Sequence, residues 1–206
     1  MTDRDVFETL AGPGEARFDI KGSEFVGRAR PVDSRDAAEA FVESVRDEYA
    51  EATHTVPAYR VRVESGRSGH LLREYQSDDG EPTGSAGKPA LNVLQQRDIQ
   101  NVVVVVTRYF GGTELGVGGL ARAYARGVKS AVADAGVVES RPQEQFAVTV
   151  DYDDSGTVRG ILESSEADFD ATYESEVHFA VTASVDDGPG IRDRIRSATS
   201  GRADVE

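Results

Sequence analysis

The sequence predicts an α+β protein built from two domains, and three observations support this prediction. Strand patterns and helix patterns alternate along most of the 206 residues. Five consecutive valines, residues 102–106, are typical of a central strand that is covered on both faces. Residues 143–206 show the order strand, helix, strand, strand, helix, strand. The dipeptide Arg141-Pro142 reads as a linker, so the domains are predicted at 1–141 and 143–206.

The first predicted domain begins with two strands and a helix. Residues 16–32 form two short strands hinged at 21–23, where Gly22 supplies turn chemistry. Asp33 or Ser34 can cap the helix that follows and runs to about residue 50. The spacing predicts that its apolar face consists of Ala37, Phe41, Val45 and Tyr49.

Two further strands lead to a glycine-rich loop and a second helix. Residues 52–66 alternate around Tyr59, Val61 and Val63, and residues 70–76 form the next strand. Pro89 is expected at the first position of the helix, where its missing N–H costs nothing. The side chains expected to pack this helix are Leu91, Val93 and Leu94.

The longest predicted helix follows the valine strand and a second glycine-rich loop. It begins at Gly118 or Gly119 and ends before Gly136, which is typical of the position after a helix. The basic residues Arg122, Arg126 and Lys129 lie on one side, and residues 137–140 add a last strand. The opposite, apolar side consists of Leu120, Ala123, Tyr124, Gly127, Val128, Ala131 and Ala135.

The second predicted domain has a ferredoxin-like βαββαβ order. Its strands are predicted at residues 146–152, 168–173, 177–185 and 202–205. Its helices are predicted at residues 155–164 and 189–199.

Composition excludes several classes of site. The chain has no cysteine, which excludes disulfides, cysteine nucleophiles and thiolate metal sites. The five valines are the longest apolar run, far short of a membrane span. The acidic N-terminus shows no basic segment followed by an apolar one, as a secretory signal peptide would, so we expect a cytoplasmic protein.

The net charge of −14 does not by itself exclude a nucleic-acid partner. Only Lys21, Lys88 and Lys129 are lysine, and an acidic, lysine-poor surface is typical of adaptation to high salt. Residues 143–206 carry −10 and residues 1–142 carry −4. Residues 73–129 hold seven bases and six acids, so the acidity is concentrated elsewhere.

The two glycine-rich loops do not fit the known nucleotide-binding motifs. In the first loop, SDDGEPTGSAGKP at 77–89, a P-loop would need glycine where Pro82 stands and Ser or Thr where Pro89 stands. The second loop, RYFGGTELGVGG at 108–119, contains a G-x-G-x-x-A pattern. However, seven residues, 110–116, follow the strand end at Tyr109 up to and including the first glycine of this pattern, whereas a Rossmann turn is tight. No nucleotide cofactor is therefore expected.

Two readings of the loops remain open. The N-terminus of the long helix offers unpaired N–H groups, and Lys88, Arg108, Arg122 and Arg126 can add positive charge for an anion. Alternatively, the glycines only close tight loops and the basic stripe is a solvated helix face.

The acidic residues and histidines of this region favour structural roles. Asp78, Asp79, Glu81 and Glu114 provide oxygens of the kind that divalent cations bind, but no histidine has ligand spacing, so no metal is predicted. The sequence Asp78-Asp79-Gly80 is typical of a turn, with Glu81 solvated or paired to arginine. His54 fits a hydrogen-bonded structural residue better than a general base.

The chain resembles the IMPACT/YigZ family in three motifs. They are Ala52-Thr53-His54 with Ala58-Tyr59, the loop SDDGEPTGSAGKP, and the stretch from Thr107 to Leu120. The resemblance implies a first domain like domain 2 of ribosomal protein S5, and a ferredoxin-like second domain similar to the last domain of the translocation elongation factor. Some members carry cysteine where this chain has Val56, so no thiol chemistry is expected there.

The resemblance also implies a link to translation. Eukaryotic members bind an activator of the amino-acid-starvation kinase and so restrain that kinase, and prokaryotic members have a conjectured nucleic-acid or ribosome-linked role. We therefore expect a non-catalytic module that contacts RNA, the ribosome or a translation-control protein through the two loops. The alternative is an enzyme that acts on a small anionic substrate at His54, Asp79, Lys88 and Arg108, with Glu81. The predicted binding residues are His54, Asp79, Gly80, Glu81, Gly84, Lys88, Arg108, Tyr109, Gly111, Gly112, Gly116, Gly118, Gly119, Arg122 and Arg126.

Overall fold

The computed structural model describes residues 6–64, 70–165 and 167–206, and its chain divides into two compact units. Phe7–Glu139 forms one unit, and Ser140–Glu206 makes up nearly all of the other. Residues 1–5 of the first predicted domain and the last two residues of the strand predicted at 52–66 lie outside the described residues. The predicted α+β class is confirmed, because helices pack on antiparallel sheets. Among the described residues, no helix is long and apolar enough to cross a bilayer.

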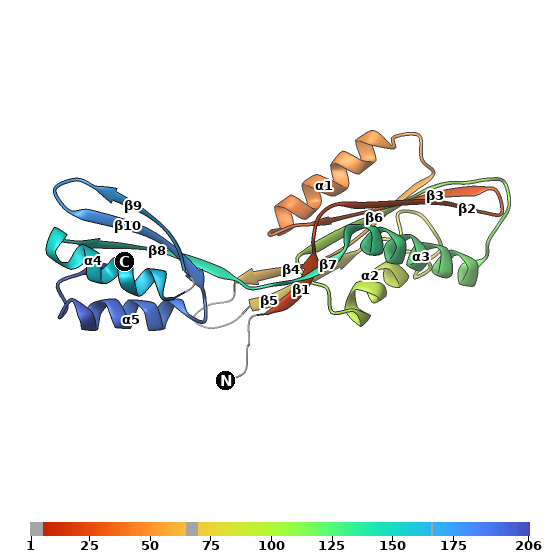
Figure 1. Cartoon of the computed structure of the whole chain (residues 1–206). Helices are drawn as coiled ribbons and strands as arrows, with labels where there is room; N and C mark the ends of the chain where they lie inside the picture. The colour runs from red at the N-terminus through yellow and green to blue at the C-terminus, as the bar shows by residue number, and fades with distance from the viewer. Residues whose placement is uncertain (1–5, 65–69, 166) are drawn as a thin grey trace. The chain divides into compact units, whose positions relative to one another are not determined.

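The larger unit is built on one five-stranded antiparallel sheet (Figure 1). The strand order is β2-β3-β6-β4-β5, so β6 lies in the middle, as the valine run predicts. Helix α1 covers one face of the sheet, and α2 and α3 cover the other. The strands are β2 (Gly14–Ile20), β3 (Ser23–Pro31), β4 (His54–Glu64), β5 (His70–Gln76) and β6 (Val102–Tyr109).

The valine strand contributes to both cores, since successive side chains point to opposite faces. Val103 and Val105 pack against α1, and Val102, Val104 and Val106 pack against α2 and α3. All five are fully buried, which confirms the predicted two-sided cover.

Helix α1 (Arg35–Glu48) is capped as predicted, but its apolar face is turned by about one residue. The Ser34 hydroxyl accepts the Ala37 N–H at 3.3 Å. The helix buries Ala38, Val42 and Val45, whereas Ala37 and Phe41, predicted on this face, are only half-buried. Both sets fit a period of 3.6 residues, and only contact with the sheet selects one.

Helix α2 (Gly87–Gln96) starts two residues before the predicted position at Pro89. The Asp78 carboxylate accepts the N–H groups of Ala86 and Gly87 at 3.0 and 2.9 Å, which extends the helix backwards. Pro89 therefore occupies the third helical position, where a missing N–H is also harmless.

Helix α3 (Val117–Ala135) buries every residue predicted on its apolar side, and Val132 as well. The helix approaches the sheet where Gly27 of β3 meets Gly127 of α3. A Cβ atom at Gly27 would lie 2.5 Å from the Gly127 carbonyl oxygen. After Gly136, strand β7 (Val137–Ser140) does not join the main sheet, because it pairs with β1 (Phe7–Leu10) in a separate ribbon.

The smaller unit has the predicted βαββαβ order and a four-stranded antiparallel sheet, β11-β8-β10-β9. Its core includes Val148 of β8, Phe179 of β10, Leu162 of α4 and Ile195 of α5. Its elements are β8 (Gln143–Val150), α4 (Tyr152–Glu163), β9 (Asp168–Tyr173), β10 (Val177–Ser184), α5 (Gly188–Ala198) and β11 (Asp204–Val205).

Substitution of Gly27 by alanine tests the close approach of α3 to the sheet. We expect Gly27→Ala to lower the free energy of unfolding by about 1–3 kcal/mol, because backbone must move to admit a methyl group. Urea-induced unfolding measures this change. The matched control is Gly118→Ala in α3, where a Cβ meets only the Arg122 guanidinium at 3.5 Å. Its stability should stay the same or rise by up to about 1 kcal/mol, and equal losses in both variants would contradict the close approach.

Candidate functional site

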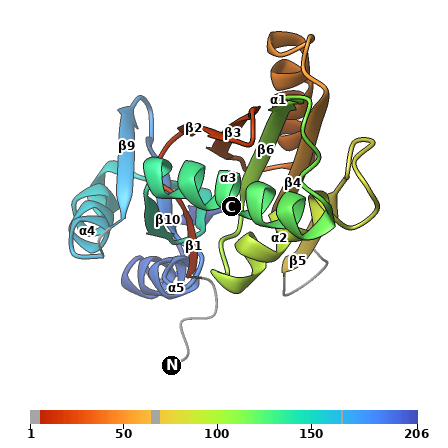
Figure 2. The ribbon, with the colours of Figure 1, turned by 90° about the vertical axis from the view of Figure 1, so that its right-hand side faces the viewer.

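One end of the five-stranded sheet gathers polar side chains from three neighbouring strands. Figure 2 looks onto this end. Arg108 of β6 pairs with Phe25 of β3 on one side and His54 of β4 on the other. Cross-strand partners share a face, and Ser23 lies two residues before Phe25. Ser23, His54 and Arg108 therefore project from the face that α2 and α3 cover.

The first glycine-rich loop runs along the beginning of β4. The turn Asp78-Asp79-Gly80-Glu81 closes with the Glu81 N–H donating to the Asp78 carbonyl at 3.0 Å. Asp79 and Gly80 both have left-handed backbone, with φ of 46° and 84°, as a type I′ turn requires. The predicted turn is confirmed.

Asp79 and His54 hold this turn against the sheet. The Asp79 carboxylate accepts the Thr55 N–H at 2.6 Å and lies 3.7 Å from the Arg46 guanidinium. The His54 Nδ1 atom lies 2.7 Å from the Asp79 carbonyl oxygen. Because a carbonyl only accepts, Nδ1 carries the hydrogen, and Nε2 is the nitrogen that faces the cluster below.

Asp78 links the turn to the start of helix α2. Its carboxylate accepts N–H groups from Gly84 at 2.7 Å, Ala86 at 3.0 Å and Gly87 at 2.9 Å. Burial acts to raise the pKa of Asp78, but these three hydrogen bonds outweigh it and hold the pKa below its usual range. The N-terminus of α2 is therefore already occupied by a carboxylate of the protein.

Glu81 is the centre of the buried cluster. Its side chain is 3% exposed, and Oε1 accepts the Arg108 Nη1–H and the Tyr124 hydroxyl, both at 2.7 Å. The His54 Nε2 atom lies 3.8 Å from Oε2. Burial, followed by the hydrogen bond and charge of Glu81, raises the pKa of Tyr124 far above its ordinary value, so the phenol stays a donor. The first loop, β6 and α3 thus meet at one carboxylate.

Arg108 completes the connection to the second glycine-rich loop. Its Nη2 donates to the Ser23 hydroxyl at 3.2 Å, and Ser23 also accepts the Gly111 N–H at 3.2 Å. The guanidinium carbon lies 5.6 Å from the Phe25 ring centre and 5.3 Å from that of Phe110. The residue is 4% exposed.

The structure corrects the predicted role of Arg108, which was expected to supply charge to a contact surface. A guanidinium that is buried and paired with Glu81 presents no net charge to a ligand outside. His54, Asp79 and Glu81 also turn towards the sheet or the cluster, whereas Gly80 is exposed. Tyr109 is not part of the site, because its side chain packs on the opposite face of the sheet, in the core under α1.

The remaining predicted residues lie on the outside. Lys88, Arg122 and Arg126 are exposed, and Arg126 lies over the Phe18 ring. The helix α3 begins after Gly116 with no side-chain cap and no acidic residue in its first turn, unlike the occupied start of α2. The other predicted glycines that are exposed are Gly84, Gly111, Gly112 and Gly118, and Gly119 is half-buried.

Four residues of this region were not predicted from the sequence as site residues. Ser23 and Tyr124 have buried polar atoms in the cluster, and Lys21 and Phe110 are exposed beside it. The signal for Tyr124 was its hydroxyl on an apolar helix face, since a buried tyrosine hydroxyl needs a partner. Ser23 lies on the same face of β3 as Phe25, but the sequence does not show which residue of the next strand lies beside it.

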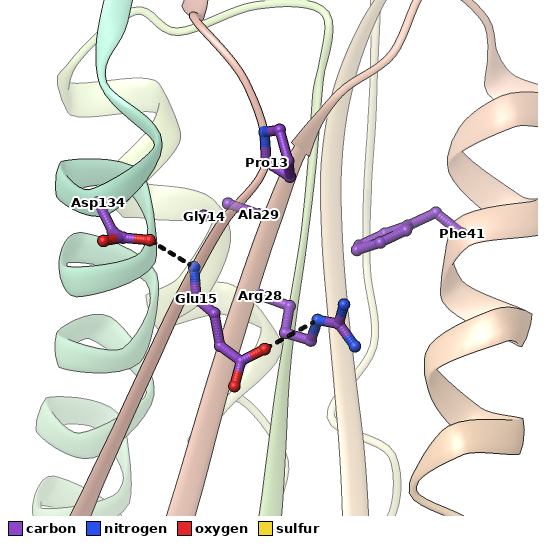
Figure 3. Close-up of a pocket in the computed structure, with 7 residues that line it drawn as sticks. All are labelled: Pro13, Gly14, Glu15, Arg28, Ala29, Phe41 and Asp134. Carbon is purple, nitrogen blue, oxygen red and sulfur yellow. Dashed lines mark hydrogen bonds and ion pairs between the residues drawn. The ribbon is translucent and has the colours of Figure 1, made fainter.

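A separate groove of about 240 Å³ lies between β2, β3 and the two helices beside them (Figure 3). None of its lining residues was predicted as a site. The Arg28 guanidinium contacts the carboxylates of Glu15 and Glu48, and Asp134 accepts the Glu15 N–H at 3.0 Å. The lining residues are Pro13, Gly14, Glu15, Arg28, Ala29, Phe41 and Asp134.

The structure brings most residues of the enzyme hypothesis together. Of the residues in the enzyme hypothesis, the structure brings His54, Glu81 and Arg108 together, with Asp79 joined through its carbonyl group. Lys88 is exposed on α2. Within residues 6–64, 70–165 and 167–206, no group of three or more acidic or histidine side chains is placed to hold a metal ion.

Comparison with known proteins identifies the relatives of this chain. A family model described as the Impact N-terminal domain matches residues 21–132. The IMPACT family member YvyE of Bacillus subtilis (strain 168) is 31% identical over 199 residues, which cover 96% of this chain and 89% of that protein. The IMPACT family member YigZ of Escherichia coli (strain K12) is 35% identical over 152 residues, 74% of this chain and 72% of that protein.

A solved structure is similar over nearly the whole chain. It is described as the crystal structure of a hypothetical protein, and the sequences are 28% identical. The match covers 98% of this chain and 96% of that chain, with a TM-score of 0.68.

Removal of Glu81 tests the buried ion pair. We expect Glu81→Ala to lower the free energy of unfolding by about 3–5 kcal/mol, because Arg108 is left buried without a counter-charge. Urea denaturation is suitable, since urea adds no ions. The double variant Glu81→Met/Arg108→Met removes both charges and should recover most of the loss. A single variant as stable as the native protein would contradict the cluster.

Loss of the Asp78 carboxylate gives a pH-dependent effect. We expect Asp78→Ala to lower stability by about 0.5–2 kcal/mol at neutral pH, as for other helix caps. The pKa of Asp78 is lowered in the folded protein. Its contribution to the free energy of unfolding is therefore complete above the unfolded-state pKa of about 3.9, and it is lost as the pH falls through the folded-state pKa. Urea unfolding at a series of pH values measures the difference. The exposed Glu114→Ala is the control, with an expected change below about 0.5 kcal/mol throughout.

Proposed function

The chain belongs to the IMPACT family, and from this premise we propose that it is a translation-associated binding protein that contacts RNA, free or in the ribosome, through its two glycine-rich loops. The observation that carries the proposal is the carboxylate of Glu81. It joins the first loop to Arg108, at the base of the second loop, and to Tyr124 of α3. The two loops are thereby fixed side by side, as a preorganised recognition surface requires.

The charge of this surface supports an anionic partner. The three acidic residues of the first loop all have partners inside the protein. Asp78 accepts three backbone N–H groups, Asp79 contacts Thr55 and Arg46, and Glu81 is buried with Arg108. An acidic sequence therefore presents little of its negative charge outwards.

The exposed charges near the loops are of both signs. The bases are Lys21 in the turn that contacts Gly111, Lys88 in the first turn of α2 and Arg122 in the first turns of α3. The exposed acids of the neighbouring segments are Asp19, Glu51 and Glu114. The three bases supply the kind of group that contacts phosphate, in a protein whose net charge is −14. The uncapped start of α3 adds backbone N–H groups of the kind that bind phosphate.

The translational role rests on the family resemblance. We extend to this chain the likeness of the larger unit to domain 2 of ribosomal protein S5, and of the smaller unit to the last domain of the translocation elongation factor. A cytoplasmic location fits the same role. A translation-control protein is the second kind of partner that the resemblance implies, and the same loops would then form a protein interface.

Salt dependence of RNA binding tests the proposal. We expect ribosomes and ribosomal RNA to bind more weakly as KCl rises, because phosphate contacts release counterions. In Lys88→Ala/Arg122→Ala, the slope of log affinity against log salt should become less negative by about 1.4, or about 0.7 for each lost contact. Co-sedimentation with ribosomes and fluorescence polarisation with labelled RNA measure this slope.

The matched control removes the same charge elsewhere. Arg35→Ala/Arg97→Ala changes two exposed arginines, one just after β3 and one at the end of α2, both near the Val102 end of the sheet. Its slope should equal that of the native protein. If the loop variant and the control behave alike, or if the native protein binds neither ribosomes nor RNA at any salt, the RNA proposal is wrong. Pull-down with a translation-control protein then tests the protein interface.

A further inference from the structure

Phe110 is an exposed aromatic side chain at the point where β6 enters the second glycine-rich loop. It is 48% exposed, although most large apolar side chains of this unit are buried in its two cores. A phenylalanine left half in water forgoes part of the stabilisation that burial would give. Its exposure leaves the ring available to a binding partner.

The backbone on both sides of Phe110 is fixed. Its N–H donates to the Thr53 hydroxyl at 3.0 Å, and the Thr53 N–H donates to the Arg108 carbonyl at 2.9 Å. The next residue, Gly111, donates its N–H to the Ser23 hydroxyl. The ring is thus carried by a segment held by Ser23 of β3 and by Thr53, the residue before β4.

Close packing adds to this restraint. Gly111 lies against Gly22 in the turn between β2 and β3, and a Cβ on Gly111 would lie 1.9 Å from the Gly22 carbonyl group. The two chain segments therefore touch through backbone alone. A side chain at either position would push the Phe110 segment away from the sheet.

Arg108 supports the ring from within the protein. Its guanidinium carbon lies 5.3 Å from the Phe110 ring centre and is held by Glu81 and Ser23. A cation meets an aromatic ring through its face. We infer that this contact uses one face of the ring and that the exposed part of the side chain offers the other.

We propose that Phe110 is a stacking platform for an unpaired base of single-stranded RNA. The proposal rests on the proposed function and narrows it from RNA in general to unpaired RNA. A base in a duplex is already stacked, whereas an unpaired base can lie flat against an aromatic ring, and such stacking tolerates any sequence.

The surroundings of Phe110 favour RNA over a protein partner. Glycines 111 and 112 leave the backbone beside the ring bare, so a sugar-phosphate chain can approach closely. Lys21 is exposed in the turn that contacts Gly111, and Lys88 is exposed at the start of α2. Lys21 is thus the lysine whose turn touches the residue after this ring. Aromatic and basic groups together are the usual elements of single-strand binding.

A single tryptophan at this position reports stacking directly. The protein contains no tryptophan, so Phe110→Trp introduces a unique fluorophore in the full chain. We expect single-stranded oligoadenylate of about 12 nucleotides to quench its emission and to bind at least as tightly as it binds the native protein. The matching RNA duplex should leave the emission nearly unchanged. Tyr152→Trp places the fluorophore at an exposed aromatic position of the smaller unit and should show no quenching.

Two further substitutions separate stacking from apolar contact. Phe110→Ala should weaken oligoadenylate binding about fivefold to a hundredfold, and Phe110→Leu should weaken it nearly as much, because leucine cannot stack. Circular dichroism and urea unfolding check that both variants fold. Full affinity in Phe110→Leu, or quenching by the duplex equal to that by the single strand, would overturn the stacking proposal.

The outcomes also distinguish this proposal from the function on which it rests. If Lys88→Ala/Arg122→Ala weakens RNA binding but Phe110→Ala does not, RNA binding stands and stacking at Phe110 is wrong. If the native protein binds neither oligoadenylate nor ribosomes, both are wrong. In that case, loss of a protein partner in Phe110→Ala but not in Tyr152→Ala would assign the exposed ring to a protein interface instead.

Discussion

A carboxylate removed from water requires a cation and hydrogen-bond donors, and Glu81 obtains both from segments that are distant in the chain. Arg108 comes from the central strand and Tyr124 from the longest helix. The first glycine-rich loop cannot leave this position without exposing or abandoning a buried charge. The arrangement of both loops therefore depends on one ion pair, with 3% and 5% of the two side chains exposed.

Contacts inside the protein also reduce the negative charge that the first loop presents at the surface. Asp78, Asp79 and Glu81 make the first loop acidic in sequence, but each directs its carboxylate to backbone N–H groups or to arginine. The exposed bases nearby are Lys21, Lys88 and Arg122, and Asp19 and Glu114 are exposed beside them. A surface suited to an anion can therefore form within a protein of net charge −14, because the negative charges of this loop are neutralised internally.

Periodicity predicted most of the fold, and its failures have local physical causes. The prediction is confirmed for the strands at 70–76 and 102–109 and for the buried side of α3. In each of these segments the spacing of apolar residues fits only one element and one buried face. Helix α1 admits two overlapping apolar faces, and only the sheet selects Ala38 and Val42. Helix α2 starts at Gly87 because Asp78, nine residues earlier, caps it. A capping residue so far upstream gives no signal in the helix itself.

The sequence alone determined the glycine-rich loops, the strand between them, the basic residues beside them and the family resemblance. It also predicted that Glu81 is either solvated or paired with an arginine. Only the tertiary structure decided which polar groups meet: Arg108 and Tyr109 are neighbours in the chain, yet one enters the buried cluster and the other packs on the opposite face of the sheet. Ser23 and Tyr124 join the cluster from segments 85 and 43 residues away from their partners. Contacts of this kind follow from strand pairing and helix docking, and no local pattern of residues encodes them.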